Sequence, residues 1–322
     1  MNDAPITLAG PALWGYLLSG AALVCFATAI LATKAASNRA NLELGFLVAL
    51  VVNVVFAGGA LVVQLLMRGE WLRFDLQAFL LFVASGLFAT YLGRWFFYES
   101  VVRFGPAEAS IFQVSSPLFT ALIAWLVLGE RLSIWVAVGM VMAIGGLALI
   151  AYKPGFFSAT PVPVVKESHQ KMGFLTRILQ SVFLLGLFSS GAYAVGNVLR
   201  GVGVRSWPEP IAGALIGALA GLAVHYFFSP DKASLGQRLR AADRPGLWLF
   251  ALVGTANISG QITTIASMRY IPLSVAALVS LCTPLLVFPL SYWLFKNQER
   301  LSLPVMLGSG FTLLGMAIVV LR

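Results

Sequence analysis

Apolar runs alternate with short polar segments along nearly the whole chain of 322 residues. A helix needs roughly 20 apolar residues to cross the hydrocarbon core of a bilayer. Ten runs of about that length each predict a membrane-spanning helix: 13–36, 44–66, 76–98, 106–128, 132–151, 178–199, 209–228, 246–268, 272–295 and 303–321. The eighth and ninth runs nearly touch, but Pro272 separates them and suits a first helical turn. The pattern predicts an all-α membrane protein with ten transmembrane helices.

The longest polar segment lies in the middle of the chain, at 153–177, and holds several prolines and charged residues. Prolines and charges together are typical of an exposed loop. This segment is therefore predicted to be a linker between a first half at 13–152 and a second half at 178–322.

The two halves carry the same motifs in the same order. The first contains Arg103-Phe104-Gly105-Pro106, Pro117, Glu130-Arg131-Leu132-Ser133, Gly139 and Gly146. The second contains Arg269-Tyr270-Ile271-Pro272, Pro284, Glu299-Arg300-Leu301-Ser302, Gly308 and Gly315. Since each half has an odd number of spans, the second half must enter the membrane from the opposite side. Inverted repeats with a site between them are the architecture of secondary transporters that work by alternating access.

The charges are too few to cover a water-facing surface. Charged residues make up 10% of the chain and hydrophobic residues 59%, whereas soluble domains carry about 25% charged residues. The net charge of +9 comes from single residues scattered over short loops, which indicates topology signals and no nucleic-acid partner. Of 21 Lys and Arg, 13 fall on the side of the central linker, 7 on the other side (Arg200 among them), and Arg94 within a span. The positive-inside rule then predicts a cytoplasmic linker and both termini outside.

Ten spans in two repeats, with a Gly129-Glu130-Arg131-Leu132-Ser133 turn and its counterpart Gln298-Glu299-Arg300-Leu301-Ser302, resemble the EamA-type members of the drug/metabolite transporter superfamily. The resemblance covers about 13–152 and 178–321. It implies a multi-pass transporter of the cytoplasmic (inner) membrane that moves small metabolites, often outward. It also implies a central cavity lined by helices 1–4 and 6–9, and it leaves the substrate open.

Arg94 is the sharpest candidate for a substrate contact, because charged side chains inside a span are costly and are functional by default. The matching position in the second half, 166 residues later, is Gly260, so the repeat itself requires no charge there. A guanidinium pairs well with carboxylate or phosphate. The alternatives are snorkelling to the interface or pairing with Glu99. Lys34, at the end of the first span, either snorkels or faces the same cavity, in which case the substrate would be anionic or zwitterionic.

A polar stripe marks the eighth span, where Asn257, Gln261 and Thr264 lie at i, i+4 and i+7 on one helix face. Such a stripe faces either a wet cavity or a neighbouring helix through hydrogen bonds. Further candidates from other spans are Tyr91, Gln113, Tyr193 and Asn197, with Asn53 and Ser116 as additional polar positions. The aromatic residues Trp95, Phe97, Tyr98 and Tyr193 form either a cage for a cation or part of an interfacial belt.

Three residues are candidates for gating or coupling: Lys34, Glu99 and His225. His225 near the end of the seventh span either relays protons or is a structural residue at the interface. All acidic residues fall near span ends or in loops, which disfavours a proton-coupled antiporter with a deep membrane carboxylate.

These features predict a secondary transporter, exporter or exchanger, of a small polar metabolite bearing carboxylate or phosphate. The alternatives are translocation of a lipid-linked or amphipathic molecule, or a receptor or scaffold without transport. The chain has no HExxH motif, no Ser/His/Asp set in its spans and no acidic metal cluster, so neither an enzyme nor a metal or other cofactor is expected. The expected partners are the substrate and the bilayer, and either a monomer or a homodimer is compatible with the glycine-rich spans.

Overall fold

The computed structural model describes residues 10–104, 109, 115–129, 134–151, 182–228, 235–279 and 283–295, together with scattered positions between 303 and 318. Every regular element in these ranges is a helix. In chain order they are α1 (Pro11–Ser37), α2 (Leu42–Arg68), α3 (Leu76–Ser85), the π-helix η1 (Gly86–Gly93), α4 (Arg94–Phe104), α6 (Ser115–Leu128), α7 (Ile134–Ala151), α9 (Val182–Ser206), α10 (Pro210–Phe228), α11 (Leu235–Ala241), α12 (Arg244–Ser267), α13 (Leu273–Val279) and α14 (Thr283–Phe295).

Five helical segments within these ranges are long and apolar enough to cross a membrane. They are Pro11–Ser37, Leu42–Arg68, Leu76–Val102, Pro210–Phe228 and Arg244–Ser267. The third of these joins α3, η1 and α4 into one continuous rod. The predicted class, an all-helical membrane protein, is thereby confirmed.

Short polar residues set where several of these helices begin. The Asn41 side chain accepts a hydrogen bond from the backbone N–H of Glu43 at 2.8 Å, and Asp75 accepts one from Ala78 at 2.9 Å. Each caps a backbone donor that the first helical turn leaves without a partner. At the other end of α2, Gly69 has a φ of 68°, which glycine adopts without steric cost. With Asn41 and Gly69 as its caps, α2 begins and ends within two residues of the predicted span 44–66.

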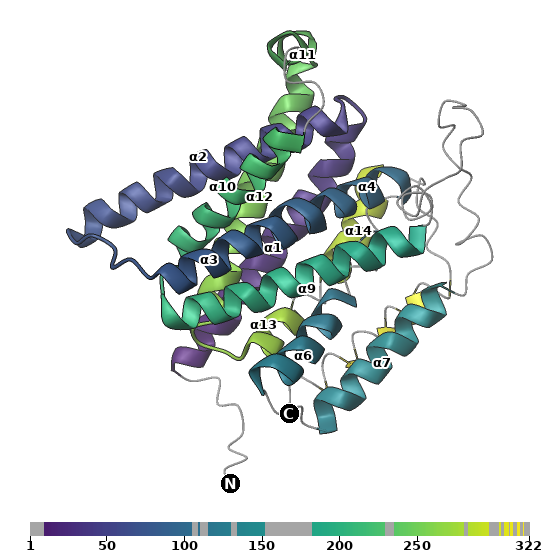
Figure 1. Cartoon of the computed structure of the whole chain (residues 1–322). Helices are drawn as coiled ribbons and strands as arrows, with labels where there is room; N and C mark the ends of the chain where they lie inside the picture. Colours follow the sequence, from purple (N-terminus) through teal and green to yellow (C-terminus); the bar gives the residue numbers. More distant parts are fainter. Residues whose placement is uncertain are drawn as a thin grey trace, which may run out of the picture.

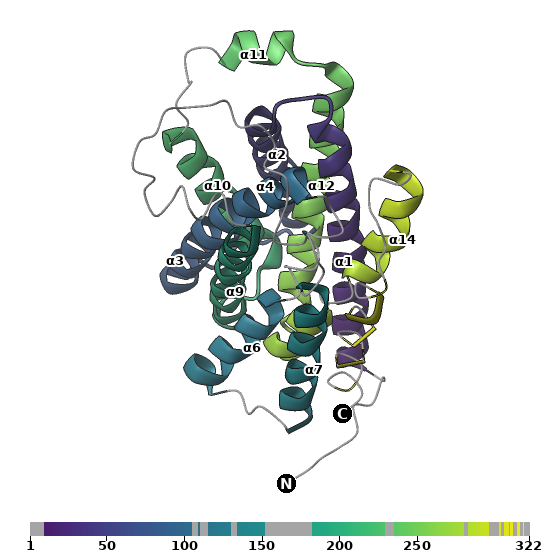
Figure 2. The same ribbon diagram turned by 90° about the vertical axis from the view of Figure 1, so that its right-hand side faces the viewer.

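Helices from the two halves of the chain pack against each other throughout the bundle (Figures 1 and 2). The helix α12 runs along α1 and also contacts α2, while α9 lies against α3, η1, α4 and α6. The helix α10 packs on α2 and η1. The described parts of the two halves therefore share one interior, and a site at its centre receives side chains from both.

The interior contains two apolar clusters, one toward each end of the bundle. One is built around the start of α2 and the start of α12, with Phe46 and Phe250 fully buried, and extends to Tyr98 on α4. The other surrounds the start of α10 and the end of α12, with Phe82 and Ile265 at its centre. Buried polar residues lie between them.

A close helix approach holds the π-helix in place. A Cβ added to Gly86, the first residue of η1, would lie 2.4 Å from the carbonyl oxygen of Gly217 on α10. Small residues at such contacts let two backbones meet and improve packing in a membrane bundle. Eight residues of π-helix inside a span are unusual, since π-turns are rare and occur mostly as single turns near functional sites. Arg94 follows directly after this segment.

Several predicted boundaries differ from the observed ones. The sixth span was predicted to end at residue 199, but α9 continues to Ser206. The third continues to Phe104, and the short helix α11 was not predicted. The ninth run contains two described helices, α13 and α14. The linker 153–177, most of the tenth span at 303–321 and the first residues of the fourth lie outside the described residues. Ten spans and their inverted relationship thus stay predictions.

Candidate functional site

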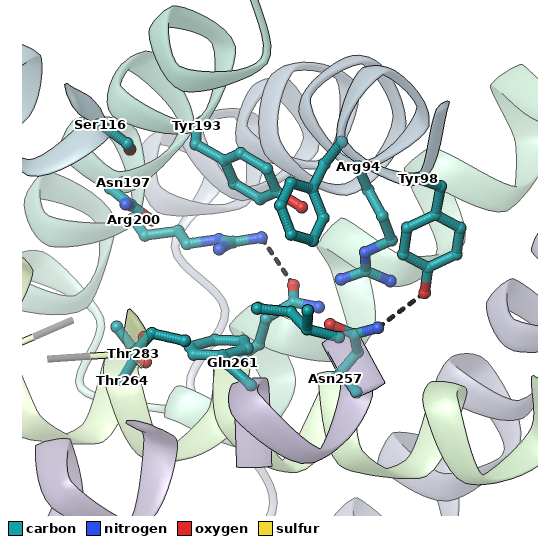
Figure 3. A pocket seen from close by; sticks show the side chains of 14 residues that line it. Arg94, Tyr98, Ser116, Tyr193, Asn197, Arg200, Asn257, Gln261, Thr264 and Thr283 are labelled. Atoms are coloured by element: carbon teal, nitrogen blue, oxygen red, sulfur yellow. Dashed lines mark hydrogen bonds between the residues drawn. The ribbon is translucent and has the colours of Figure 1, made fainter. Parts of the chain in front are cut away.

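A cavity of about 100 Å³ lies between the two apolar clusters. Its lining comes from α1, α4, α6, α9, α12 and α14, and therefore from both halves of the chain (Figure 3). The lining residues are Phe26, Ala29, Ile30, Arg94, Phe97, Tyr98, Ser116, Tyr193, Asn197, Arg200, Asn257, Gln261, Thr264 and Thr283.

Arg94 enters the cavity from the first turn of α4 and is only 2% exposed. One of its terminal nitrogens donates to the amide oxygen of Asn53 on α2. The Asn53 amide nitrogen in turn donates to the backbone oxygens of Ala49 and Gly254, at 3.1 and 2.7 Å. This orients the amide with its oxygen toward the guanidinium. Arg94 also interacts with the Tyr193 hydroxyl.

Arg200 reaches the cavity from α9, on the other side from Arg94 (Figure 3). Its side chain is 4% exposed. Its Nη2 donates to Gln261 Oε1 at 2.6 Å and to Thr90 Oγ1 at 3.1 Å. The Thr90 hydroxyl also lies 3.3 Å from Gln261 Oε1. Arg200 is thereby held between η1 of the first half and α12 of the second.

A second hydrogen bond across the cavity fixes Asn257. Its Nδ2 donates to the hydroxyl oxygen of Tyr98 at 2.8 Å (Figure 3). Tyr98 is almost fully buried, at 2% exposed. Two turns further along α12, the Thr264 hydroxyl donates back to the Gly260 carbonyl at 2.7 Å. The Thr264 hydroxyl proton is engaged in this bond, so toward the cavity Thr264 offers a hydrogen-bond acceptor and a methyl group.

The cavity carries two positive charges and, among the lining residues that the structure describes, no carboxylate. The two guanidiniums line the same cavity, and their like charges repel each other. Two further donors, Arg94 Nε and Gln261 Nε2, are buried and have no hydrogen-bond partner in the described chain. A buried donor without a partner is costly. The arrangement is therefore complementary to a small anion rich in acceptor oxygens.

Most of the predicted substrate contacts come together in this one cavity. Its lining includes Arg94, Tyr193, Asn197, Asn257, Gln261 and Thr264. Gln113 lies outside the described residues. Tyr91 is elsewhere, with its ring 6.2 Å from that of Phe46.

The three candidates for gating or coupling do not line the cavity. His225 is 5% exposed and packs edge-on against Phe46 of an apolar cluster, with ring centroids 5.1 Å apart. The rings of Tyr91 and Trp95 are also near it, at 6.1 and 6.2 Å. Lys34 and Glu99 are half-buried.

The proposed aromatic cage is only partly assembled. Phe97, Tyr98 and Tyr193 line the cavity, but Trp95 packs on His225. Two arginines share the space with these rings and would repel a cationic ligand. The cage for a cation is thus disfavoured by its surroundings.

Sequence reasoning missed Arg200, because the sixth span was ended one residue before it. A signal was present, however. Tyr193, Asn197 and Arg200 lie at i, i+4 and i+7, the same spacing as Asn257, Gln261 and Thr264. The two stripes belong to α9 and α12, and both face the cavity. Thr283 of α14 was also missed, and it stands alone in an apolar stretch.

Known proteins resemble this chain in part of its sequence and in its fold. Residues 13–152 match the sequence model of the EamA-like transporter family. The fold matches 25 chains in solved structures. In one crystal structure the alignment covers 95% of this chain and 96% of the other, with 19% identical residues and a TM-score of 0.63. No curated protein matches. The resemblance seen in the sequence is confirmed over residues 13–152, which match the EamA-like transporter family.

Proposed function

We propose that the protein is a secondary transporter of a small anion that carries a carboxylate or phosphate group. The observation that supports this most directly is the pair of buried arginines, Arg94 and Arg200, in one cavity whose described lining has no acidic side chain. In the proposal, the two guanidiniums bind the anionic group, while Asn197, Asn257 and Gln261 contact the rest of the molecule.

The energetic argument concerns the cost of burying charge. Moving an isolated ion out of water costs several kcal/mol even after the protein relaxes, unless an opposite charge and hydrogen bonds compensate. For Arg200, the neutral side chains of Thr90 and Gln261 supply part of this compensation by accepting hydrogen bonds. An anion in the cavity would supply the missing negative charge. A cation would add a third positive charge to the same space.

The positions of the apolar clusters fit alternating access. The cavity lies between them, and both halves of the chain contribute to its walls. In the proposed cycle, each cluster closes one route to the cavity while the other opens, as the two halves rock against each other around the site. Export or exchange across the inner membrane, with the linker in the cytoplasm, follows from the family resemblance and the Lys/Arg distribution.

A thermal-shift screen on the purified full chain tests the proposal. Small carboxylates, inorganic phosphate, zwitterionic amino acids and cationic amines are compared on the wild type, Arg94→Gln and Arg200→Gln. A ligand that binds only the folded state raises the melting temperature by mass action. Arg73→Gln is the matched control, because Arg73 is exposed in the link between α2 and α3.

We expect a carboxylate or phosphate to stabilise the wild type and Arg73→Gln, and to lose its effect in both cavity variants. Counterflow of that anion in proteoliposomes should follow the same order. Stabilisation by cations, or equal stabilisation by anions in all four proteins, would overturn the proposal.

A further inference from the structure

A second hollow, separate from the cavity, opens between α2 and α10. Its volume is about 650 Å³. All its lining residues are apolar apart from one tyrosine: Leu47, Val48, Val51, Val52, Leu219, Leu222, Ala223, Tyr226, Phe227 and Leu239. None of them lines the central cavity. We call this hollow the α2–α10 groove.

The apolar walls of the groove indicate that it faces the bilayer. Both of its walls are helices long and apolar enough to span the membrane. Its rim is open, since Leu219 is 47% exposed and Phe227 is 71% exposed. In such a position the natural occupant is a lipid acyl chain.

The helix α11 lies across one end of the groove. It crosses the ends of the long helices (Figures 1 and 2), and Leu239 from its middle forms part of the lining. Two ion pairs tie this corner to the turn between α1 and α2. Arg238 Nη2 lies 3.1 Å from Glu43 Oε2, and Arg39 Nη1 lies 3.6 Å from Asp243 Oδ2.

The same corner carries an excess of positive charge. Four arginines gather there, Arg39, Arg238, Arg240 and Arg244, against the two carboxylates of Glu43 and Asp243. The two carboxylates are engaged in the ion pairs to Arg238 and Arg39. Arg240 and Arg244 are both exposed, and Arg240 directly follows Leu239 of the groove lining. The helix that closes one end of the groove thus carries the exposed Arg240, and the exposed Arg244 begins the next helix.

We propose that the α2–α10 groove is a binding site for an anionic phospholipid, with one acyl chain along α2 and α10 and the phosphate beside Arg240 and Arg244. Each Lys or Arg near a negatively charged leaflet adds electrostatic attraction. A zwitterionic lipid carries its own cation in the headgroup and forfeits most of this. By the Lys/Arg distribution this corner lies on the cytoplasmic side, where anionic lipids attract basic segments. The site does not depend on the transported substrate.

Native mass spectrometry of the detergent-solubilised full chain tests this site, with equimolar phosphatidylglycerol and phosphatidylcholine of identical acyl chains. The variants are Arg240→Gln/Arg244→Gln for the headgroup and Leu219→Trp, with Val51→Trp as a second choice, for the chain. Arg73→Gln, at an exposed arginine in the link between α2 and α3, is the control for removing an exposed positive charge elsewhere on the chain.

We expect the wild type and Arg73→Gln to retain phosphatidylglycerol several-fold over phosphatidylcholine. The double arginine variant should bind both lipids equally, and the tryptophan variants should bind less of both. Equal binding of the two lipids by the wild type would overturn the proposal, and so would unchanged selectivity in the double variant. A dimer that forms only when the groove is free of lipid would instead assign the groove to a second copy of the chain. Because the double variant alters only exposed side chains, its folding can be verified by an unchanged melting temperature without added lipid.

Discussion

Arg200 Nη2 lies 2.6 Å from Gln261 Oε1, and this hydrogen bond joins α9 to α12 across the wall of the cavity. Arg200 is the last residue of the α9 stripe and Gln261 is the middle residue of the α12 stripe, and both are nearly inaccessible to solvent. The bond leaves Gln261 Nε2 without a partner. A buried charge, a fixed amide and an unused donor are therefore concentrated at one point, where a bound anion would be recognised.

Arg200→Lys should weaken anion binding about tenfold, or roughly 1.4 kcal/mol. Lysine keeps the charge but lacks the planar guanidinium, which can pair with a carboxylate or phosphate through two N–H groups while Nη2 holds Thr90 and Gln261. The measurement is the apparent Kd of the stabilising anion in the thermal-shift assay. Arg205→Lys, at the exposed end of the same helix, should leave it unchanged. An equal loss in both variants would contradict a specific role for Arg200.

Tyr98→Phe should lower the free energy of unfolding by about 1–2 kcal/mol, because it removes the acceptor of the Asn257 amide inside the bundle. The measurement is equilibrium unfolding in mixed micelles, completed as a double-mutant cycle with Asn257→Leu. The pair should cost less than the sum of the two single changes. Strict additivity would show that the 2.8 Å contact contributes no coupling.

Gly86→Ala should lower the melting temperature, with a loss of about 1–3 kcal/mol typical of overpacking. The added Cβ would meet the Gly217 carbonyl oxygen at 2.4 Å, and backbone atoms cannot move aside as a flexible side chain can. Gly58→Ala in α2 is the matched control, since its Cβ would meet nothing within 4 Å. That control should be neutral or gain up to about 1 kcal/mol from helix propensity. The same melting temperature in both variants would argue against close packing of η1 on α10.

Arg238→Glu should destabilise the docking of α11 by about 0.5–1 kcal/mol, because it places two carboxylates together in a half-buried site. Adding Glu43→Arg should restore the wild-type melting temperature at low salt. The Arg39–Asp243 pair is longer and more exposed, at 55% and 41% for the two side chains, so Asp243→Asn should cost less from the ion pair itself. Failure of the charge swap to rescue would show that the helix is held by other contacts.

Much of the fold could be read from local patterns. Runs of apolar residues predicted the spans, and the caps at Asn41 and Asp75 depend only on residues next to them in the chain. The stripe at Asn257, Gln261 and Thr264 was also predictable, since helical periodicity places these residues on one face. The residues on one helix face can be read from the sequence alone, because their spacing does not depend on which helix packs against that face.

Tertiary structure decided which charges are buried. Arg200 was assigned to a loop because a guanidinium at the end of an apolar run is most simply placed in water. It is accommodated inside α9 only because Thr90 and Gln261, from two distant segments, supply acceptors. Likewise Tyr91 and His225 pack against Phe46, away from the cavity, for reasons that lie in the neighbouring helices. The sequence by itself determined the membrane class and the polar stripes, whereas the two-arginine cavity arises only when helices from both halves pack together.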